Sequence, residues 1–193
     1  MNNIVVFASG SGSNIQAIIN AINEGRIHGR IAGLIASKEG IKAIERARIN
    51  GIESYVPHSD NDVLEKVQTW SPSIIVLAGY LKKIPEQLVQ LYKNRIINIH
   101  PSLLPKYGGK GFYGIHVHRA VIESGDTESG CTVHIVTEEY DDGPILAQSK
   151  IQVLPEYTAE DLAAAVLKEE HILLPQVIEQ LINTESDLGT KTT

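Results

Sequence analysis

The chain has 193 residues, of which 42% are hydrophobic and 21% charged, and its formal net charge at pH 7 is -6. These values fit one globular domain with a full core, and the negative balance argues against nucleic acid as a partner. A single cysteine excludes an intramolecular disulfide. Because the chain has neither a secretory signal nor an apolar run of ~18 residues, we expect a cytoplasmic protein with no membrane partner.

The first hundred residues alternate short apolar runs with helical patterns. Several of these runs are apolar on both faces, which is typical of strands in a parallel sheet covered by helices on each side. The order predicts right-handed βαβ crossovers and an open, twisted, Rossmann-like α/β sheet. The expected strands are 4–8, 31–36, 52–56, 74–78 and 96–99, and the expected helices are 13–23, 41–50, 62–70 and 85–93.

The second half of the chain has a different pattern. A loop rich in glycine and proline covers 101–115, and loops of this length are usually functional or disordered. A short helix over 116–124 is followed by two strands, 130–136 and 145–153, whose short acidic connection predicts an antiparallel hairpin. A helix from 158 to about 181 completes a single domain over 1–183, and a polar, frayed tail is expected over 184–193.

The segment Ala8-Ser9-Gly10-Ser11-Gly12-Ser13-Asn14 follows the first strand and precedes the first helix. Glycines allow the backbone to approach an anion, and the free N–H groups of the helix start point at it. Ser13 or Asn14 suits the cap position. The loop departs from the dinucleotide fingerprint because no glycine lies three residues after Gly12, and the P-loop lysine is missing, so a terminal monophosphate is a more natural ligand than a pyrophosphate. The alternative is a flexible turn without a ligand.

Asn98 and His100 stand two residues apart at the end of the expected strand 96–99. Strand side chains alternate, so the two point to the same face. An amide N–H can stabilise a developing negative oxygen while an imidazole transfers a proton. Because open α/β sheets bind ligands at the carboxyl ends of their strands, the pair indicates chemistry at a carbonyl. The alternative is a histidine that only forms structural hydrogen bonds.

The acidic loop 137–144 contains Asp141 and Asp142, either of which is placed to meet His100 across a cleft. Such a carboxylate would orient the imidazole and raise its pKa, so that it stays protonated nearer neutral pH. The alternative is a solvated hairpin turn. His116 and His118 raise the question of a metal site, but histidines two apart on a helix face different directions and no motif completes a ligand set, so we expect no metal.

With these motifs, the chain resembles the phosphoribosylglycinamide formyltransferase family, the folate-dependent enzymes of purine biosynthesis. The resemblance extends from residue 3 to about residue 182. Its most specific parts are the loop 9–14, Leu77-Ala78-Gly79-Tyr80, the run NIHPSLLPKY at 98–107, and Asp141 with Gly143. The HPSLLP element is shared with other formyltransferases that use 10-formyltetrahydrofolate, whereas the phosphate loop and the short length are specific to this family.

The resemblance implies roles for individual residues. Asn98, His100 and Asp141 would be the catalytic trio. Gly12, Ser13, Asn14 and Glu170 would bind the substrate, glycinamide ribonucleotide, and the folate site would comprise Tyr80, Leu81, Lys82, Lys83, Glu138, Glu139, Tyr140 and Asp142. The chain departs from many relatives by having Lys82 in place of an arginine, Asp142 in place of a glycine, and a longer loop over 108–114 that would be either a mobile flap or an insertion without a role.

The implied reaction is direct transfer of the formyl group of 10-formyltetrahydrofolate, a co-substrate, to the amine of glycinamide ribonucleotide, through a tetrahedral intermediate. Asn98 and a protonated His100 would stabilise the oxyanion, and Asp141 would position a water that moves the proton. The partners would be these small molecules, and the protein a monomer or weak homodimer. The rivals are a folate deformylase, whose relatives carry an extra N-terminal segment, a methionyl-tRNA formyltransferase, which needs a further C-terminal domain, and a binder without catalysis.

Overall fold

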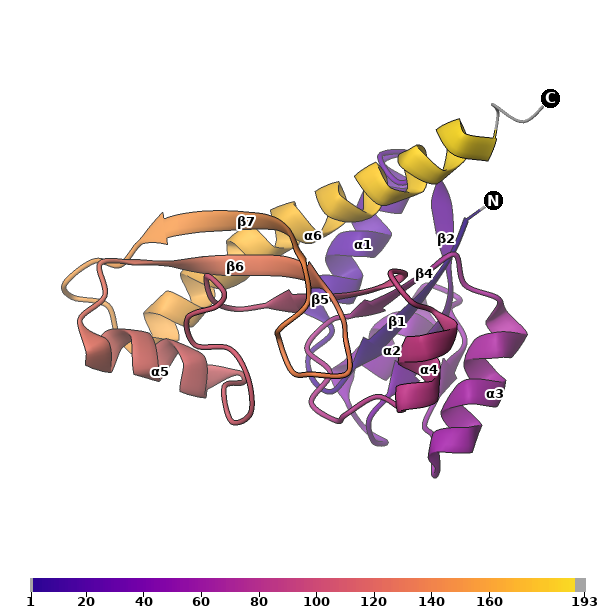
Figure 1. Cartoon of the computed structure of the whole chain (residues 1–193), viewed down its shortest axis with the longest axis horizontal. Helices are drawn as coiled ribbons and strands as arrows, with labels where there is room; N and C mark the ends of the chain where they lie inside the picture. The colour runs from indigo at the N-terminus through magenta and orange to yellow at the C-terminus, as the bar shows by residue number, and fades with distance from the viewer. Residues whose placement is uncertain (1, 190–193) are drawn as a thin grey trace.

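The structure, a computed structural model, describes the backbone of residues 2–189 and the side chains of residues 2–183. A seven-stranded sheet with the order β3-β2-β1-β4-β5-β6-β7 runs through the molecule (Figure 1). The strands are β1 (Asn2–Ala8), β2 (Gly29–Ala36), β3 (Ser54–Tyr55), β4 (Ile74–Leu77), β5 (Ile96–His100), β6 (Glu128–Ile135) and β7 (Ile145–Gln152). β1 to β5 pair in parallel and β6 and β7 antiparallel, which confirms the predicted mixed sheet.

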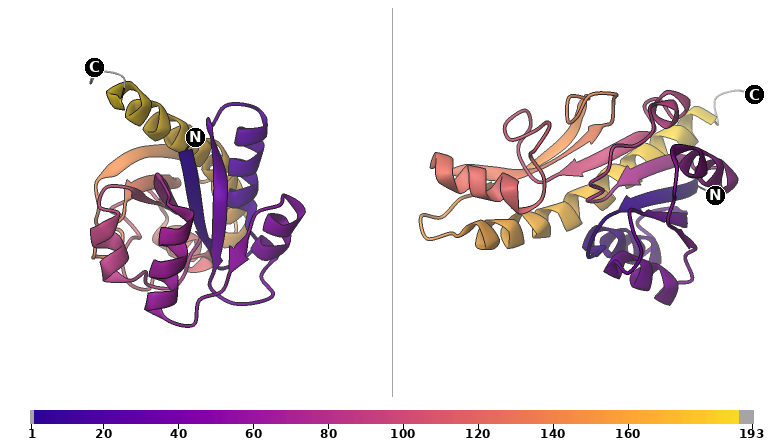
Figure 2. Two further views of the ribbon diagram at one scale, coloured as in Figure 1. Left: turned by 90° about the vertical axis from the view of Figure 1, so that its right-hand side faces the viewer. Right: turned by 90° about the horizontal axis from the view of Figure 1, so that it is seen from below.

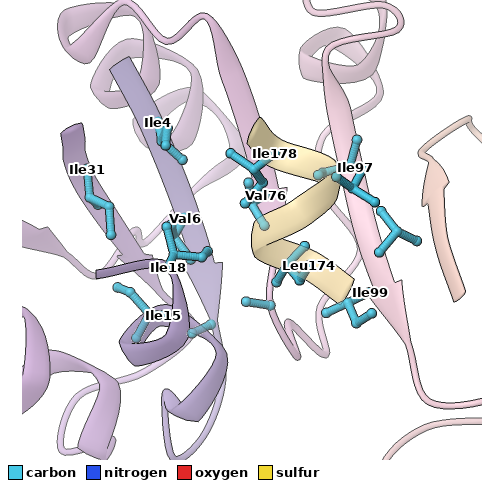
Figure 3. Packing of buried hydrophobic residues seen from close by; sticks show 14 of the residues in the cluster. Ile4, Val6, Ile15, Ile18, Ile31, Val76, Ile97, Ile99, Leu174 and Ile178 are labelled. Atoms are coloured by element: carbon cyan, nitrogen blue, oxygen red, sulfur yellow. The ribbon is translucent and has the colours of Figure 1, made fainter. Parts of the chain in front are cut away.

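Helices cover both faces of the sheet, as the two-sided apolar strands predicted. They are α1 (Ser13–Asn23), α2 (Lys42–Ile49), α3 (Asp60–Trp70), α4 (Glu86–Leu91), α5 (Ile115–Ser124) and α6 (Ala159–Gly189). Alternate residues of β1 divide between two cores: Ile4 and Val6 pack with α1 and α6, whereas Val5 and Phe7 pack with α3 and α4. Figure 3 shows the first core, in which side chains of β1, β4 and β5 meet those of α1 and α6.

Two elements differ in extent from the prediction. The expected strand 52–56 forms only the two-residue β3 at the sheet edge. The last helix continues past residue 181 to Gly189, and Ile182 is still buried against the core. The predicted tail 184–193 therefore begins inside a helix, and its last four residues lie outside the described part of the chain. Within residues 2–189, no helix has both the length and the apolar character needed to cross a membrane.

The sheet topology places the site. From β1 the chain moves through β2 and β3 to one edge, then returns to β4 and β5 on the other side of β1. In open α/β sheets the crevice for a ligand lies at the carboxyl ends of the strands where the order reverses. The loops after β1, β4 and β5 leave the sheet at this point. Figure 2 shows that α5 lies at the other end of the molecule from α2 and α3.

Candidate active site

A cavity of about 660 Å³ lies at the carboxyl ends of β1, β4 and β5. Its walls come from segments that are far apart in the sequence. They include 9–14, 77–84, 98–101, 109–115 and 136–141, with His118, His134, Ala163, Leu167 and Glu170. The cavity has the size of a small-molecule site, and the crossover topology explains why the connections β1–α1, β4–α4 and β5–α5 meet there, beside the β6–β7 loop.

The glycine loop after β1 starts α1 without a side-chain cap. Gly12, with a φ of 71°, is the N-cap, so the prediction of Ser13 or Asn14 as the cap is wrong. A Cβ on Gly12 would lie 2.7 Å from the Cα of Ala43, and only glycine fits this close approach in a left-handed conformation. Since no side chain caps this end, the first N–H groups of α1 are open to an anion at the cavity wall.

Asn14 does not cap the helix because its side chain turns inward. Its Nδ2 donates a hydrogen bond of 2.7 Å to Oε2 of Glu170 on α6, and both residues are buried. Burial raises the pKa of Glu170 to about 7, although the hydrogen bond from Asn14 opposes the shift. The Asn14 Oδ1 is buried and has no hydrogen-bond partner among the described residues. Two residues 156 positions apart thus form one polar corner of the cavity.

The carboxylate of Asp141 lies at the centre of a cluster of nitrogen atoms. Its Oδ1 is 3.4 Å from Nδ2 of Asn98, 3.5 Å from Nδ1 of His100 and 3.5 Å from Nε2 of His134. Its Oδ2 accepts a hydrogen bond of 2.9 Å from the backbone N–H of Gly109. The structure therefore brings together the three residues proposed from the sequence as a trio, and it adds His134.

His134 was missed by the sequence analysis, which placed it in a buried strand. In the antiparallel register of β5 and β6, His134 lies opposite Asn98. The Nδ2 of Asn98 donates to Nε2 of His134 at 3.1 Å, and Nδ1 of His134 is 2.9 Å from the carbonyl of Ile135. The predicted hairpin was the only sequence signal that could have pointed to His134. It does not give the pairing register that places His134 beside Asn98, because tertiary contacts set that register.

The hydrogen bonds to backbone carbonyls fix where each imidazole carries its hydrogen. A carbonyl only accepts, so His134 carries hydrogen on Nδ1, and His100, whose Nε2 lies 2.8 Å from the carbonyl of Tyr107, carries it on Nε2. When the rings are neutral, Nε2 of His134 and Nδ1 of His100 are therefore bare. Both of these nitrogens lie 3.5 Å from Oδ1 of Asp141, so protonation of either ring creates a donor that pairs with the carboxylate.

Burial determines the charge of His100. Burial lowers the pKa of His100, and the charge of His134 lowers it further. Asp141 and the hydrogen bond to the Tyr107 carbonyl act in the opposite direction, but the pKa of His100 still lies below its usual value. The expectation that the carboxylate keeps His100 protonated nearer neutral pH is wrong for this reason. Burial also raises the pKa of Asp141, but the contacts with His134, His100 and the N–H of Gly109 together bring it below its ordinary value. The carboxylate is thus ionised at neutral pH.

The proposed folate residues lie on two loops at the mouth of the cavity, with one exception. Those on the cavity wall are Tyr80, Leu81, Lys82, Lys83, Glu138, Glu139 and Tyr140. Asp142 is exposed and does not line the cavity. Tyr80 packs edge-on against Phe7 with ring centroids 5.2 Å apart, and the Nζ of Lys83 pairs with Glu86 at 2.9 Å. Two exposed aromatic side chains of the loop 108–114, Phe112 and Tyr113, complete the rim.

The two histidines of α5 lie on different sides of the helix, as their spacing predicted. His118 is buried at the cavity wall, whereas His116 is exposed and packs edge-on against the ring of Tyr113. Within residues 2–183, no group of three or more His, Cys, Asp or Glu side chains is arranged to hold a metal ion. The absence of a metal stays a prediction.

Comparison with known proteins identifies the class. The model of the formyl transferase family matches residues 2–178, and the chain belongs to this family. It is 44% identical over 185 residues to the chloroplastic phosphoribosylglycinamide formyltransferase of Arabidopsis thaliana, covering 91% of this chain but only 63% of that protein. The phosphoribosylglycinamide formyltransferase of Escherichia coli is 38% identical, with 91% and 85% covered. Glycinamide ribonucleotide transformylase 1 of Symbiobacterium toebii has the same fold, with a TM-score of 0.88, 37% identity, and coverage of 95% and 89%.

Proposed function

We propose that this chain transfers the formyl group of 10-formyltetrahydrofolate to the amine of glycinamide ribonucleotide, which gives formylglycinamide ribonucleotide and tetrahydrofolate. The observation that carries the proposal is the convergence of Asn98, His100 and His134 on Asp141, beside a helix start open to phosphate. The names of relatives that align along nearly the whole chain support the same reaction.

The nucleotide occupies the part of the cavity formed by the glycine loop and α6. The phosphate lies against Gly12, Ser13 and Asn14, where the dipole and the N–H groups at the start of α1 favour an anion. Glu170 contacts the glycinamide portion. Its buried carboxylate and the Oδ1 of Asn14, which has no hydrogen-bond partner within the described part of the chain, are acceptors that suit the N–H groups of an amine and an amide.

The folate occupies the mouth of the cavity, between the loops after β4 and before β7. Leu77, Ala78 and Gly79 bring the pterin near β5, and apolar surface from Tyr80 and Leu81 covers it. Lys82 and Lys83 supply positive charge for an acidic tail, with Lys82 offering a point charge where an arginine would offer a planar fork. Glu138, Glu139 and Tyr140 form the opposite wall. Asp142 lies away from the cavity, so it affects folate binding only through its neighbours.

The chemistry follows from the cluster. The free amine attacks the formyl carbon, and the C–N10 bond breaks after a tetrahedral intermediate forms. An N–H of Asn98 donates to the oxyanion in place of its long 3.4 Å contact with Asp141, and one such donor is worth about 2.7–4 kcal/mol. The amine proton passes to a water held by Asp141 and the bare Nδ1 of His100, and from there to the leaving N10. No covalent intermediate on the enzyme is needed.

A coupled assay with both substrates tests this proposal. Formyl transfer that requires the nucleotide and releases tetrahydrofolate supports it. Release of formate from the folate without any nucleotide would instead make the chain a deformylase, and binding of both ligands without turnover would make it a binder. The monomer or weak homodimer and the cytoplasmic location both remain predictions, the first of which sedimentation measurements would test.

A further inference from the structure

The orientation of His100 depends on a backbone carbonyl outside the cavity wall. His100 Nε2–H donates to the carbonyl of Tyr107 at 2.8 Å, and this contact leaves Nδ1 facing Asp141. Tyr107 has a φ of 55°, a left-handed conformation that a bulky aromatic residue rarely adopts. The surrounding contacts must therefore hold this residue in place.

The side chain of Tyr107 is held by the last residue of α5 and by the segment that follows it. Its hydroxyl donates to Oδ2 of Asp126 at 2.9 Å and lies 2.6 Å from Oγ of Ser124. Asp126 also pairs with Nζ of Lys106 at 3.0 Å. The loop itself is braced, because Oγ of Ser102 donates to the carbonyl of Lys106 at 2.6 Å. A chain of contacts thus links the end of α5 to the peptide that fixes His100.

Tyr107 and Asp126 do not line the 660 Å³ cavity. They lie instead on a separate hollow of about 290 Å³, behind the loop after β5. Neither residue is therefore in a place to touch a ligand of the proposed active site. Tyr107 reaches the cavity wall through two contacts: its carbonyl accepts a hydrogen bond from His100, and its ring packs edge-on against Phe112 with centroids 6.0 Å apart. Of these two, only the first involves a residue of the proposed catalytic trio.

We propose that Tyr107 and Asp126 are positioning residues for His100: Asp126 holds the phenol of Tyr107, and the carbonyl of Tyr107 fixes the hydrogen of His100 on Nε2. This inference rests on the proposed function, because there the bare Nδ1 of His100 holds, with Asp141, the water that takes up the amine proton. Without the hydrogen bond between Asp126 and the Tyr107 hydroxyl, the Tyr107 carbonyl moves. The ring of His100 then rotates or takes up hydrogen on Nδ1, and Nδ1 no longer faces Asp141 as an acceptor. Small misplacements of reacting groups are costly, and we expect kcat to fall about 10- to 100-fold.

The test compares Tyr107→Phe and Asp126→Asn with a matched control, Glu45→Gln, which removes a surface ion pair with Arg48 on α2. We measure kcat and both KM values, together with the ¹⁵N spectrum of histidine-labelled protein, in which His100 is assigned by its loss in His100→Asn. We expect kcat to fall in both variants with the KM values nearly unchanged, and the His100 signals to shift from the Nε2–H tautomer towards Nδ1–H. The control should behave as the wild type.

Two results would overturn the inference: an unchanged kcat in Tyr107→Phe, or a lower kcat with the His100 signals unaltered. If Asp126→Asn fails to fold, Tyr107→Phe still tests the inference, because it removes only one hydroxyl. Failure of the proposed function is recognised separately, because wild-type protein would then lack formyl transfer. In that case the spectrum alone decides whether the brace sets the tautomer.

Discussion

Nδ1 of His100, at the end of β5, lies 3.5 Å from Oδ1 of Asp141, in the loop between β6 and β7. Burial leaves the imidazole neutral and its neighbours leave the carboxylate ionised, so the pair faces the cavity with one negative charge and a bare nitrogen. This arrangement suits the uptake of a proton from an attacking amine. The predictions below depend on it and on the buried groups nearby.

Replacing either member of this pair should remove most of the turnover. We expect His100→Ala and Asp141→Asn to lower kcat by about 10²- to 10⁴-fold, because each removes part of the acid–base path. Neither residue lies at the glycine loop, so nucleotide affinity measured by titration calorimetry should change little. Glu24→Gln, which removes an exposed ion pair with Arg26 after α1, serves as the matched control. A loss of nucleotide affinity as large as the loss of kcat would contradict these roles.

The dependence of kcat on pH should show that neutral His100 is the active form. His100 is faced by Asp141, His134 and His118, and its pKa lies below 6.5. With saturating substrates, kcat should therefore stay level at neutral pH and fall only as the pH drops through that lowered pKa. A fall as the pH rises through the same range would mean that protonated His100 is required.

His134 should influence the dependence of kcat on pH. Its charge lowers the pKa of His100, so His134→Asn should raise that pKa and move the acid limb of kcat to higher pH. The same variant should lower kcat, because Nε2 of His134 orients the amide of Asn98. An acid limb that moves to lower pH, or stays in place, would show that His134 does not act on His100.

Glu170→Gln should stabilise the protein at alkaline pH. The pKa of Glu170 rises from 4.5 to about 7 on folding, so its contribution to stability is full below pH 4.5 and is lost as the pH rises towards 7. A glutamine avoids the buried charge and still accepts the bond from Asn14. We expect a gain of up to about 3 kcal/mol in the free energy of unfolding above pH 7, and none below pH 4.5. Urea unfolding at the two pH values measures the difference, and an equal gain at both would disprove it.

Gly12→Ala should destabilise the protein and weaken nucleotide binding. The new Cβ would lie 2.7 Å from the Cα of Ala43, at a φ of 71°, and such strain costs about 1–3 kcal/mol. Gly10→Ala is the control for stability, because no atom lies within 4 Å of its added Cβ. Thermal unfolding measures both. Equal melting temperatures for the two variants would show that the glycine loop is not constrained as described.

The sequence alone determined the elements and their order, because hydrophobic periodicity is a local property of the chain. Strands apolar on both faces predicted a covered parallel sheet, and the spacing of Asn98 and His100 predicted that both point the same way. Glycines and polar residues at strand ends indicated the edge where the cavity lies. These inferences need only the geometry of a strand and the direction of crossovers.

Only the tertiary structure decided which groups meet and in which charge state. The register of β5 against β6 brought in His134, and the fold of the β6–β7 loop placed Asp141 on the cavity but Asp142 outside it. Burial, which depends on every neighbouring element, lowered the pKa of His100 against the effect of its carboxylate partner. Local sequence carries no measure of that desolvation, because it comes from residues distant in the chain that exclude water together.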